Sequence, residues 1–223
     1  MNKFRWVVAL LTVMFSQPGL CSSQVSLSFT AEVEPPPCHI IQIPATLDFG
    51  NINRNQLSAK APTQLPVKSF TGAITIQCEA PTSIGLSAVD NSGGHALETG
   101  SLQWTSPNVT LMPVQTDQRF GLGMTPAGSA IGVWNVVFHS AQVDGAPAQI
   151  GVANNGALDL NDTVPTMRNN GRVNCWVQNN RFATGSLFTV QADAAVSIAP
   201  TQELASGSKI NFAGSVTLEV VYL

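Results

Sequence analysis

Charged side chains are scarce in this chain of 223 residues. Asp, Glu, Lys and Arg make up 10% of it, against about a quarter of an average soluble protein. Asn and Gln together outnumber the 13 acidic and 10 basic residues, so the polar surface must consist largely of amides and hydroxyls. A net charge of -3 provides no cationic field for phosphate groups, which argues against nucleic-acid binding.

Strong helix formers are also few. The chain carries 18 Gly and 14 Pro with few Lys or Glu, a composition that disfavours long helices. Hydrophobic residues nevertheless make up 44% of the sequence. That proportion supplies a core large enough to offset chain entropy, so the composition excludes a disordered chain and favours a compact β fold.

Long apolar runs are missing except at the start of the chain. Residues 6–15 are apolar apart from Thr12 and follow Lys3 and Arg5, but ten residues are too few to cross a bilayer, which takes about 20. Small residues follow between Gly19 and Gln24. We therefore expect residues 1–23 to be a secretory signal peptide, an exported mature chain, and no integral membrane segment.

Export changes the interpretation of the cysteines. In an oxidising compartment Cys38 and Cys78, each in an apolar strand-like context, form the natural disulfide pair. Closing a loop of about 40 residues stabilises a fold by about 3 to 4 kcal/mol in the chain-entropy model. Cys175 is left over. It fits a buried thiol on one face of the alternating run 173–177, a bond to Cys21 if cleavage spares it, or an intermolecular link.

Alternation of apolar and polar residues predicts strands along most of the chain. Residues 25–33 alternate cleanly, and Pro35, Pro36 and Pro37 then interrupt any strand ladder. Further strands are expected at 40–43, 47–52, 70–78, 84–88, 120–124, 187–198 and 212–222, with a strand buried on both faces at 131–138 and mostly loops at 144–171. We expect an N-terminal extension at 24–37 and one β-sandwich domain at 38–223.

Catalytic and metal-binding patterns find little support. His39, His95 and His139 are isolated from one another, in no HxH or HExxH spacing, and the sequence lacks a G-x-S-x-G elbow. We therefore expect no enzyme activity, no metal and no cofactor. Trp104 and Trp176 lie beside polar loops, where an indole could stack on a sugar, although such residues more often serve packing.

The two ends of the chain and several internal stretches carry a resemblance to a known family. A signal peptide and an extension precede Cys38, "LDFGNI" follows it, Cys78 ends a strand, and the chain closes with "GSVTLEVVYL". This pattern resembles the pilins, or fimbrial subunits, assembled by the bacterial chaperone–usher route. The stretches "ITIQCEAPTSIGLSAVDN" and "FGLGMTPAGSAIGVWNV" are similar to a pilin-like family of exported proteins from enterobacteria and their relatives.

The resemblance implies an all-β, immunoglobulin-like sandwich that lacks its final strand. In that family a periplasmic chaperone lends the missing strand, and the extension of the next subunit later replaces it. Carried over to this sequence, the donor side chains are Val25, Leu27, Phe29, Ala31 and Val33. The groove edge, which also binds the chaperone, is formed by Val216, Leu218, Val220, Tyr222 and Leu223, with the Leu223 carboxylate at the chaperone's basic anchor.

The function implied is that of a structural pilus subunit or pilin-like surface protein. Its partners would be the periplasmic chaperone, the outer-membrane usher and neighbouring pilin subunits, and its location the periplasm in transit and then the fimbrium or cell surface. The alternative is a carbohydrate-binding adhesin or a soluble periplasmic β-sandwich binding module, with a host glycan as ligand. The sequence departs from the family in having no glycine within residues 25–33, long loops between 90 and 170, and the additional Cys175.

Overall fold

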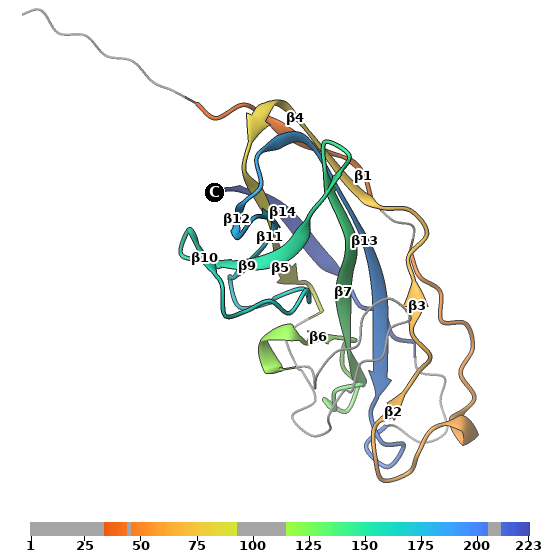
Figure 1. Ribbon diagram of the computed structural model, residues 1–223. Helices are drawn as coiled ribbons and strands as arrows, with labels where there is room; N and C mark the ends of the chain where they lie inside the picture. The colour runs from red at the N-terminus through yellow and green to blue at the C-terminus, as the bar shows by residue number, and fades with distance from the viewer. Residues whose placement is uncertain (1–33, 44–45, 93–114, 205–210) are drawn as a thin grey trace, which may run out of the picture. The chain divides into compact units, whose positions relative to one another are not determined.

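The computed structural model describes residues 34–43, 46–92, 115–204 and 211–223 (Figure 1). The described chain forms two antiparallel sheets, joined by loops and by two single-turn 3-10 helices, η1 (Arg54–Gln56) and η2 (Thr116–Gln118). The predicted fold class, an all-β sandwich, is confirmed. The chain divides into two compact units, Met1–Glu34 and Pro35–Leu223, and both sheets belong to the second. The predicted signal peptide and the alternating segment 25–33 lie outside the described residues.

The first sheet has the strand order β1-β4-β13-β7-β6. These strands are β1 (Cys38–Gln42), β4 (Ile74–Thr82), β13 (Gly185–Ile198), β7 (Gly132–Val143) and β6 (Phe120–Gly121). Two short strands, β2 (Thr63–Gln64) and β3 (Lys68–Ser69), also pair with β13, and β8 (Ala146–Pro147) pairs with β7. The long β13 therefore holds this sheet together, with β7 along one side and β4, β3 and β2 in succession along the other.

The second sheet has the order β10-β9-β11-β5-β14. Its strands are β10 (Ala157–Asp159), β9 (Gln149–Asn154), β11 (Val173–Gln178), β5 (Ile84–Asp90) and β14 (Val216–Tyr222), and β12 (Arg181–Phe182) pairs with β11. Each sheet thus ends at an edge strand drawn from near one end of the chain. Those edge strands are β1 in the first sheet and β14 in the second.

The core confirms the prediction for residues 131–138, because every residue from Ile131 to Phe138 is buried. Trp134 is a core residue, as expected, and its ring lies 5.5 Å from that of Phe120. Trp176 packs at 5.3 Å against Phe188 and is 1% exposed. The idea that Trp176 could stack on a sugar is therefore wrong, since its indole is covered by protein. Trp104 lies outside the described residues.

The region 144–171 holds more strand than the sequence indicated. It contains β8, β9 and β10, and β9 is a buried strand between β10 and β11. The sequence pattern of β9 was a weak indication of a strand, because Gly151 and Ala153 alternate with only two larger apolar residues, Ile150 and Val152. The small side chains are needed there: a Cβ on Gly151 would lie 2.7 Å from Cγ2 of Val177 on β11.

Candidate functional site

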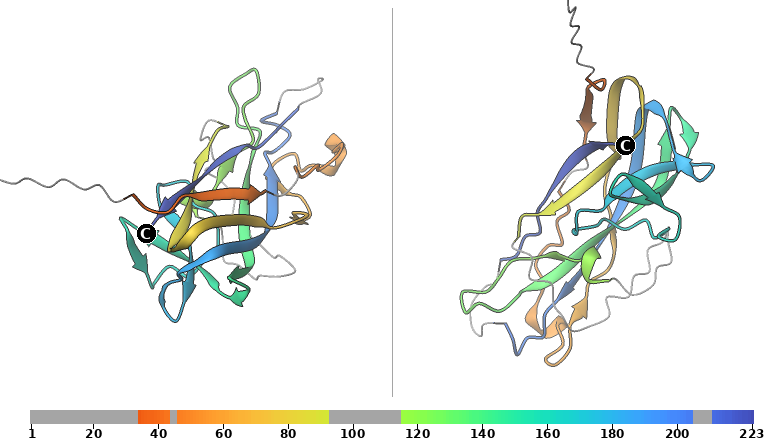
Figure 2. Two further views of the ribbon diagram at one scale, coloured as in Figure 1. Left: turned by 90° about the horizontal axis from the view of Figure 1, so that it is seen from above. Right: turned by 90° about the vertical axis from the view of Figure 1, so that its left-hand side faces the viewer.

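An apolar groove separates the edge strands β1 and β14. It has a volume of about 1140 Å³, and its walls include Ile40 and Ile41 on one side and Val216 and Leu218 on the other. The floor is the inner face of the first sheet, with Ile74, Trp134, Val136, Ala192, Ala194 and Val196. Seen from above, β1 and β14 diverge from the end where the C-terminus lies (Figure 2, left). The groove therefore lies above side chains of the core.

Each of the two edge strands has one ladder partner. β1 pairs with β4 and β14 pairs with β5, and among the described residues neither has a partner strand on its other side. An edge strand offers unpaired backbone N–H and C=O groups to any chain that comes alongside. Apolar side chains stand at the same edge: Ile41 is 61% exposed and Ile43 67% exposed. The opening between β1 and β14 therefore offers both unpaired backbone groups and exposed apolar side chains.

The structure divides the five residues predicted for the groove edge among four places. Val216 and Leu218 are half-buried and line the groove. Val220 packs against the core. Leu223 packs instead against a small cluster of Ala153, Cys175 and Val177, and its backbone N–H donates to the Ser83 carbonyl at 3.0 Å. Tyr222 lies at the end of the groove where β1 and β14 converge, which we call the closed end.

At the closed end, the Tyr222 hydroxyl makes two hydrogen bonds that link the end of β14 to the start of β1. The backbone N–H of Cys38 donates to the Tyr222 hydroxyl oxygen at 3.1 Å, and this hydroxyl donates to the Pro36 carbonyl at 3.0 Å. The predicted disulfide between Cys38 and Cys78 is confirmed and lies at the same end. Sequence reasoning missed this use of Tyr222, because the bond joins residues 184 positions apart.

The other end of the groove is bordered by the loop that contains residues 46–57. Lys68 lies 4.9 Å above the ring centroid of Phe49 and donates from Nζ to the Asp48 carbonyl at 2.5 Å. Arg54 donates to the carbonyl oxygen of Thr201 at 2.5 Å. These contacts fix the loop beside the groove.

A second cavity of about 500 Å³ lies beside β7, β9 and β10, where His139, Asp159, Leu160 and Asp162 are among its lining residues. His139 Nε2 lies 3.3 Å from Oδ1 of Asp193, a carboxylate that is 0% exposed. The next residue, Ser140, has a left-handed backbone with φ of 51°. His139, which the sequence showed only as isolated from the other histidines, is thus paired with a buried acid at an irregularity of β7.

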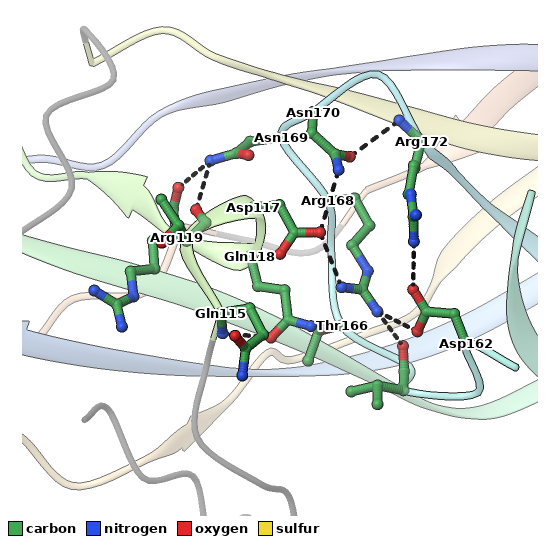
Figure 3. Close-up of polar contacts among 12 residues, drawn as sticks. Gln115, Asp117, Gln118, Arg119, Asp162, Thr166, Arg168, Asn169, Asn170 and Arg172 are labelled. Carbon is green, nitrogen blue, oxygen red and sulfur yellow. Dashed lines mark hydrogen bonds and ion pairs between the residues drawn. The ribbon is translucent and has the colours of Figure 1, made fainter. Parts of the chain in front are cut away.

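A polar network beside this cavity pins residues 159–172 onto the η2 segment (Figure 3). Arg168 is 3% exposed and lies between two carboxylates, with Nη1 3.2 Å from Asp117 and Nη2 2.6 Å from Asp162. Arg172 reaches the same Asp162 at 2.9 Å. Since all of these groups have partners within the chain, the network stabilises the loop rather than exposing free charges.

The remaining cysteine of the described chain, Cys175, is a free thiol that is 0% exposed. Burial raises its pKa to about 12 from the ordinary 9.0, because a thiolate loses its hydration in the apolar cluster. This supports the buried-thiol interpretation. Within the described ranges no group of three or more His, Cys, Asp or Glu is placed to hold a metal ion, and no helix has the length and hydropathy to cross a membrane.

Comparison with known proteins finds a matching family model and a distantly similar solved structure. A family model described as "Protein of unknown function (DUF1120)" matches residues 30–135, less than half of the chain. The crystal structure of the P pilus rod subunit PapA is similar with a TM-score of 0.37 and 12% identity, over 84% of this chain and 99% of that one. No curated protein sequence matches. The pilin-like family suggested by the sequence motifs stays a prediction.

Proposed function

We propose that this chain is a structural subunit of a pilus or a pilin-like surface protein, completed by a strand donated from another chain. The apolar groove between β1 and β14 carries this proposal. A strand lying there would find backbone partners on both edge strands and would cover the exposed apolar side chains. The donor we propose is the alternating segment of a second copy, with Val25, Leu27, Phe29, Ala31 and Val33 facing the groove floor.

The expected affinity follows from the apolar side chains of the donor. Burying four or five of them at about 1.5 to 3 kcal/mol each contributes about 6 to 15 kcal/mol before the cost of ordering the strand. A complex of that strength dissociates slowly without a covalent bond, as a subunit contact in a surface fibre requires.

The first experiment compares the chain 24–223 with the chain 34–223, which lacks the alternating segment. A peptide of residues 25–33, added at about 100 times its Kd, stabilises the bound form by about 2.7 kcal/mol. For a domain of this size we expect the Tm of the shorter chain to rise by about 5 to 10 °C. The longer chain should form ladders that survive electrophoresis without boiling.

The control peptide carries Leu27→Ser and Phe29→Ser, which remove two apolar side chains and keep the backbone. It should raise the Tm little. If chains 24–223 and 34–223 are equally stable monomers, and the unaltered peptide leaves the Tm of the shorter chain where it was, donation of a strand is refuted.

The proposal also predicts how the chain would be exported and assembled. An open groove is an aggregation hazard until it is covered, so a periplasmic chaperone should occupy it first, along Val216, Leu218 and Val220 and with Leu223 near its anchor. An outer-membrane usher and neighbouring subunits would follow. The chain would pass through the periplasm to a fimbrium or the cell surface, and its role would be structural rather than enzymatic, without a cofactor.

A second candidate is carbohydrate binding, as an adhesin or a periplasmic binding module. The observation that favours it is the cavity of about 500 Å³ beside β7 and β9, where Asp159 and Gln149 stand next to Leu158 and Leu160. Sites that combine a few polar groups with apolar walls suit small ligands. A glycan array separates the two functions: binding that is lost with Asp159→Ala and kept with Leu218→Asn would favour this one.

A further inference from the structure

The Tyr222 hydroxyl joins the two strands that flank the groove, and the chain ahead of β1 leaves from the same point. The hydroxyl accepts from the Cys38 N–H at 3.1 Å and donates to the Pro36 carbonyl at 3.0 Å. It is the side chain of the single tyrosine in the sequence. The peptide group of Pro36 and the first residue of β1 are thereby held against the last residue of β14.

The strand directions at this end limit what the chain's own extension can do. β1 begins at Cys38 and runs away from the closed end, whereas β14 runs toward it and ends at Tyr222. Residues 25–33 precede Pro35, so they could enter their own groove only by reversing direction within residues 34–37. They would then run antiparallel to β1, as the first arm of a hairpin.

The three prolines oppose that reversal. Each ring fixes φ near -65°, and a residue that precedes a proline avoids the helical region that most tight turns require. Glu34, Pro35 and Pro36 all precede a proline, so three consecutive residues favour extended backbone. The spacer Pro35–Pro37 is therefore stiff, and the hydrogen bond from the Tyr222 hydroxyl holds the Pro36 carbonyl in its middle.

We infer that Tyr222 and the spacer Pro35–Pro37 form a latch that holds the extension out of the chain's own groove and presents it to a second copy. This inference rests on the proposed function and adds the means by which strand donation occurs between chains rather than within one. Tyr222 acts here as a positioning residue, since it directs the extension and does not line the groove.

The test uses the mature chain 24–223 and two variants. One is Tyr222→Phe, which removes the hydroxyl and keeps the ring; the other is the triple variant Pro35→Gly, Pro36→Ser, Pro37→Gly. The ratio of oligomer to monomer is measured by sedimentation at a series of concentrations. Binding of a fluorescent peptide of residues 25–33 to the separated monomers reports whether the groove is open, and the Tm is recorded for each chain.

The expected result is that wild-type monomers bind the peptide, and that monomers of the triple variant bind it at least tenfold more weakly because their own extension fills the groove. The oligomer fraction should fall in the triple variant and, to a smaller extent, in Tyr222→Phe. The matched control is Thr217→Val, which removes the β14 hydroxyl that donates to Asn91 at 3.1 Å and should change neither readout.

Two results would overturn the latch. If both variants keep the wild-type ratio and peptide affinity, with or without a lower Tm, the contacts are merely structural, and donation of a strand between chains stands without them. If wild-type monomers themselves bind no peptide, the proposed function fails and the latch fails with it.

Discussion

Consecutive residues of β11 face two different environments. Cys175 belongs to the cluster with Ala153 and Val177, whereas Trp176 belongs to the main core and donates from Nε1 to the Thr189 carbonyl at 2.9 Å. Alternation in the sequence predicted the thiol face correctly. It gave no sign that Leu223, at the end of the chain, packs against the same cluster.

The raised pKa of Cys175 predicts a pH dependence of stability. The unfolded chain loses the thiol proton near pH 9, whereas the folded chain keeps it up to about pH 12. The folded state therefore binds more protons between these values, and the free energy of unfolding falls as pH rises through this window, by at most about 1.4 kcal/mol per unit. Below pH 9 the thiol is protonated in both states and contributes no pH dependence.

The measurement is urea unfolding of the chain 24–223 at several pH values from 8 upward, for the wild type and for Cys175→Ala. The alanine variant should lose less stability over the alkaline part of the series, because other titrating groups are common to both chains. Parallel curves for the two proteins would show that the thiol ionises freely in the folded state.

At the scale of elements, the strands of the second sheet approach closely through residues with small side chains. Gly151 on β9 faces Val177 on β11 with no room for a methyl group. This is why the strand reads as a loop in the sequence: the residue that permits the approach lacks the apolar side chain that would have revealed a strand.

The substitution Gly151→Ala tests that approach. Its Cβ would lie 2.7 Å from Val177 Cγ2, so the two strands must shift, and we expect a loss of about 1 to 3 kcal/mol in the free energy of unfolding. The matched control is Gly121→Ala on β6, where the nearest atom lies at 3.5 Å and the change should stay within about 1 kcal/mol of zero. Equal effects on urea unfolding would contradict the packing argument.

The Arg168 network gives a second prediction for an element. Arg168→Ala leaves Asp117 without its arginine partner in a partly buried site, and we expect a cost of about 2 to 4 kcal/mol. The Met167 N–H, which donates to the Val136 carbonyl at 2.9 Å, should exchange faster with deuterium. The control Arg181→Ala removes an exposed arginine and should change stability by less than about 0.5 kcal/mol. Unchanged exchange at Met167 would show that the arginine does not hold the loop.

The sequence predicted many of the strands, which depend on local patterns, but the strand expected at 47–52 is wrong, because these residues form no strand. Alternation located the strand that contains Val216 and Leu218, and compartment reasoning paired Cys38 with Cys78. Contacts between distant segments were missed: Arg168 with Asp117, His139 with Asp193, and Tyr222 with Pro36. Polar side chains carry no periodic signal, so their partners become visible only when the strands have been placed in sheets.

At the scale of the whole molecule, the sandwich ends at one side in two edge strands with an apolar opening between them. The first sheet closes its other side with short strands, and β10 is the short edge of the second. Among the described residues, β1 and β14 therefore combine an unpaired strand edge with apolar side chains that line the groove. Short edge strands are a common protection against unwanted pairing, and β14 with its seven residues does not have it.

Neighbouring residues on β14 allow the groove to be tested directly. Leu218→Asn places an amide in the groove wall, so binding of the 25–33 peptide to the chain 34–223 should weaken by about tenfold or more, in line with the loss of one buried apolar side chain. Glu219→Asn alters the exposed neighbour, outside the groove lining, and should leave the affinity within about twofold. Fluorescence titration measures both, and equal affinities would place the peptide elsewhere.

The disulfide at the closed end determines how a mechanical pull would travel through the molecule. Tension applied to the chain ahead of Cys38 crosses the sulfur–sulfur bond to Cys78 on β4 and enters β5 at Ile84, which pairs with Tyr222 of β14. The 39 residues between the two cysteines are bypassed. A stretched chain would therefore leave η1 and the loop beside the groove unloaded, while the force passes from Cys78 through β4 into β5 and then across the hydrogen-bonded ladder to β14.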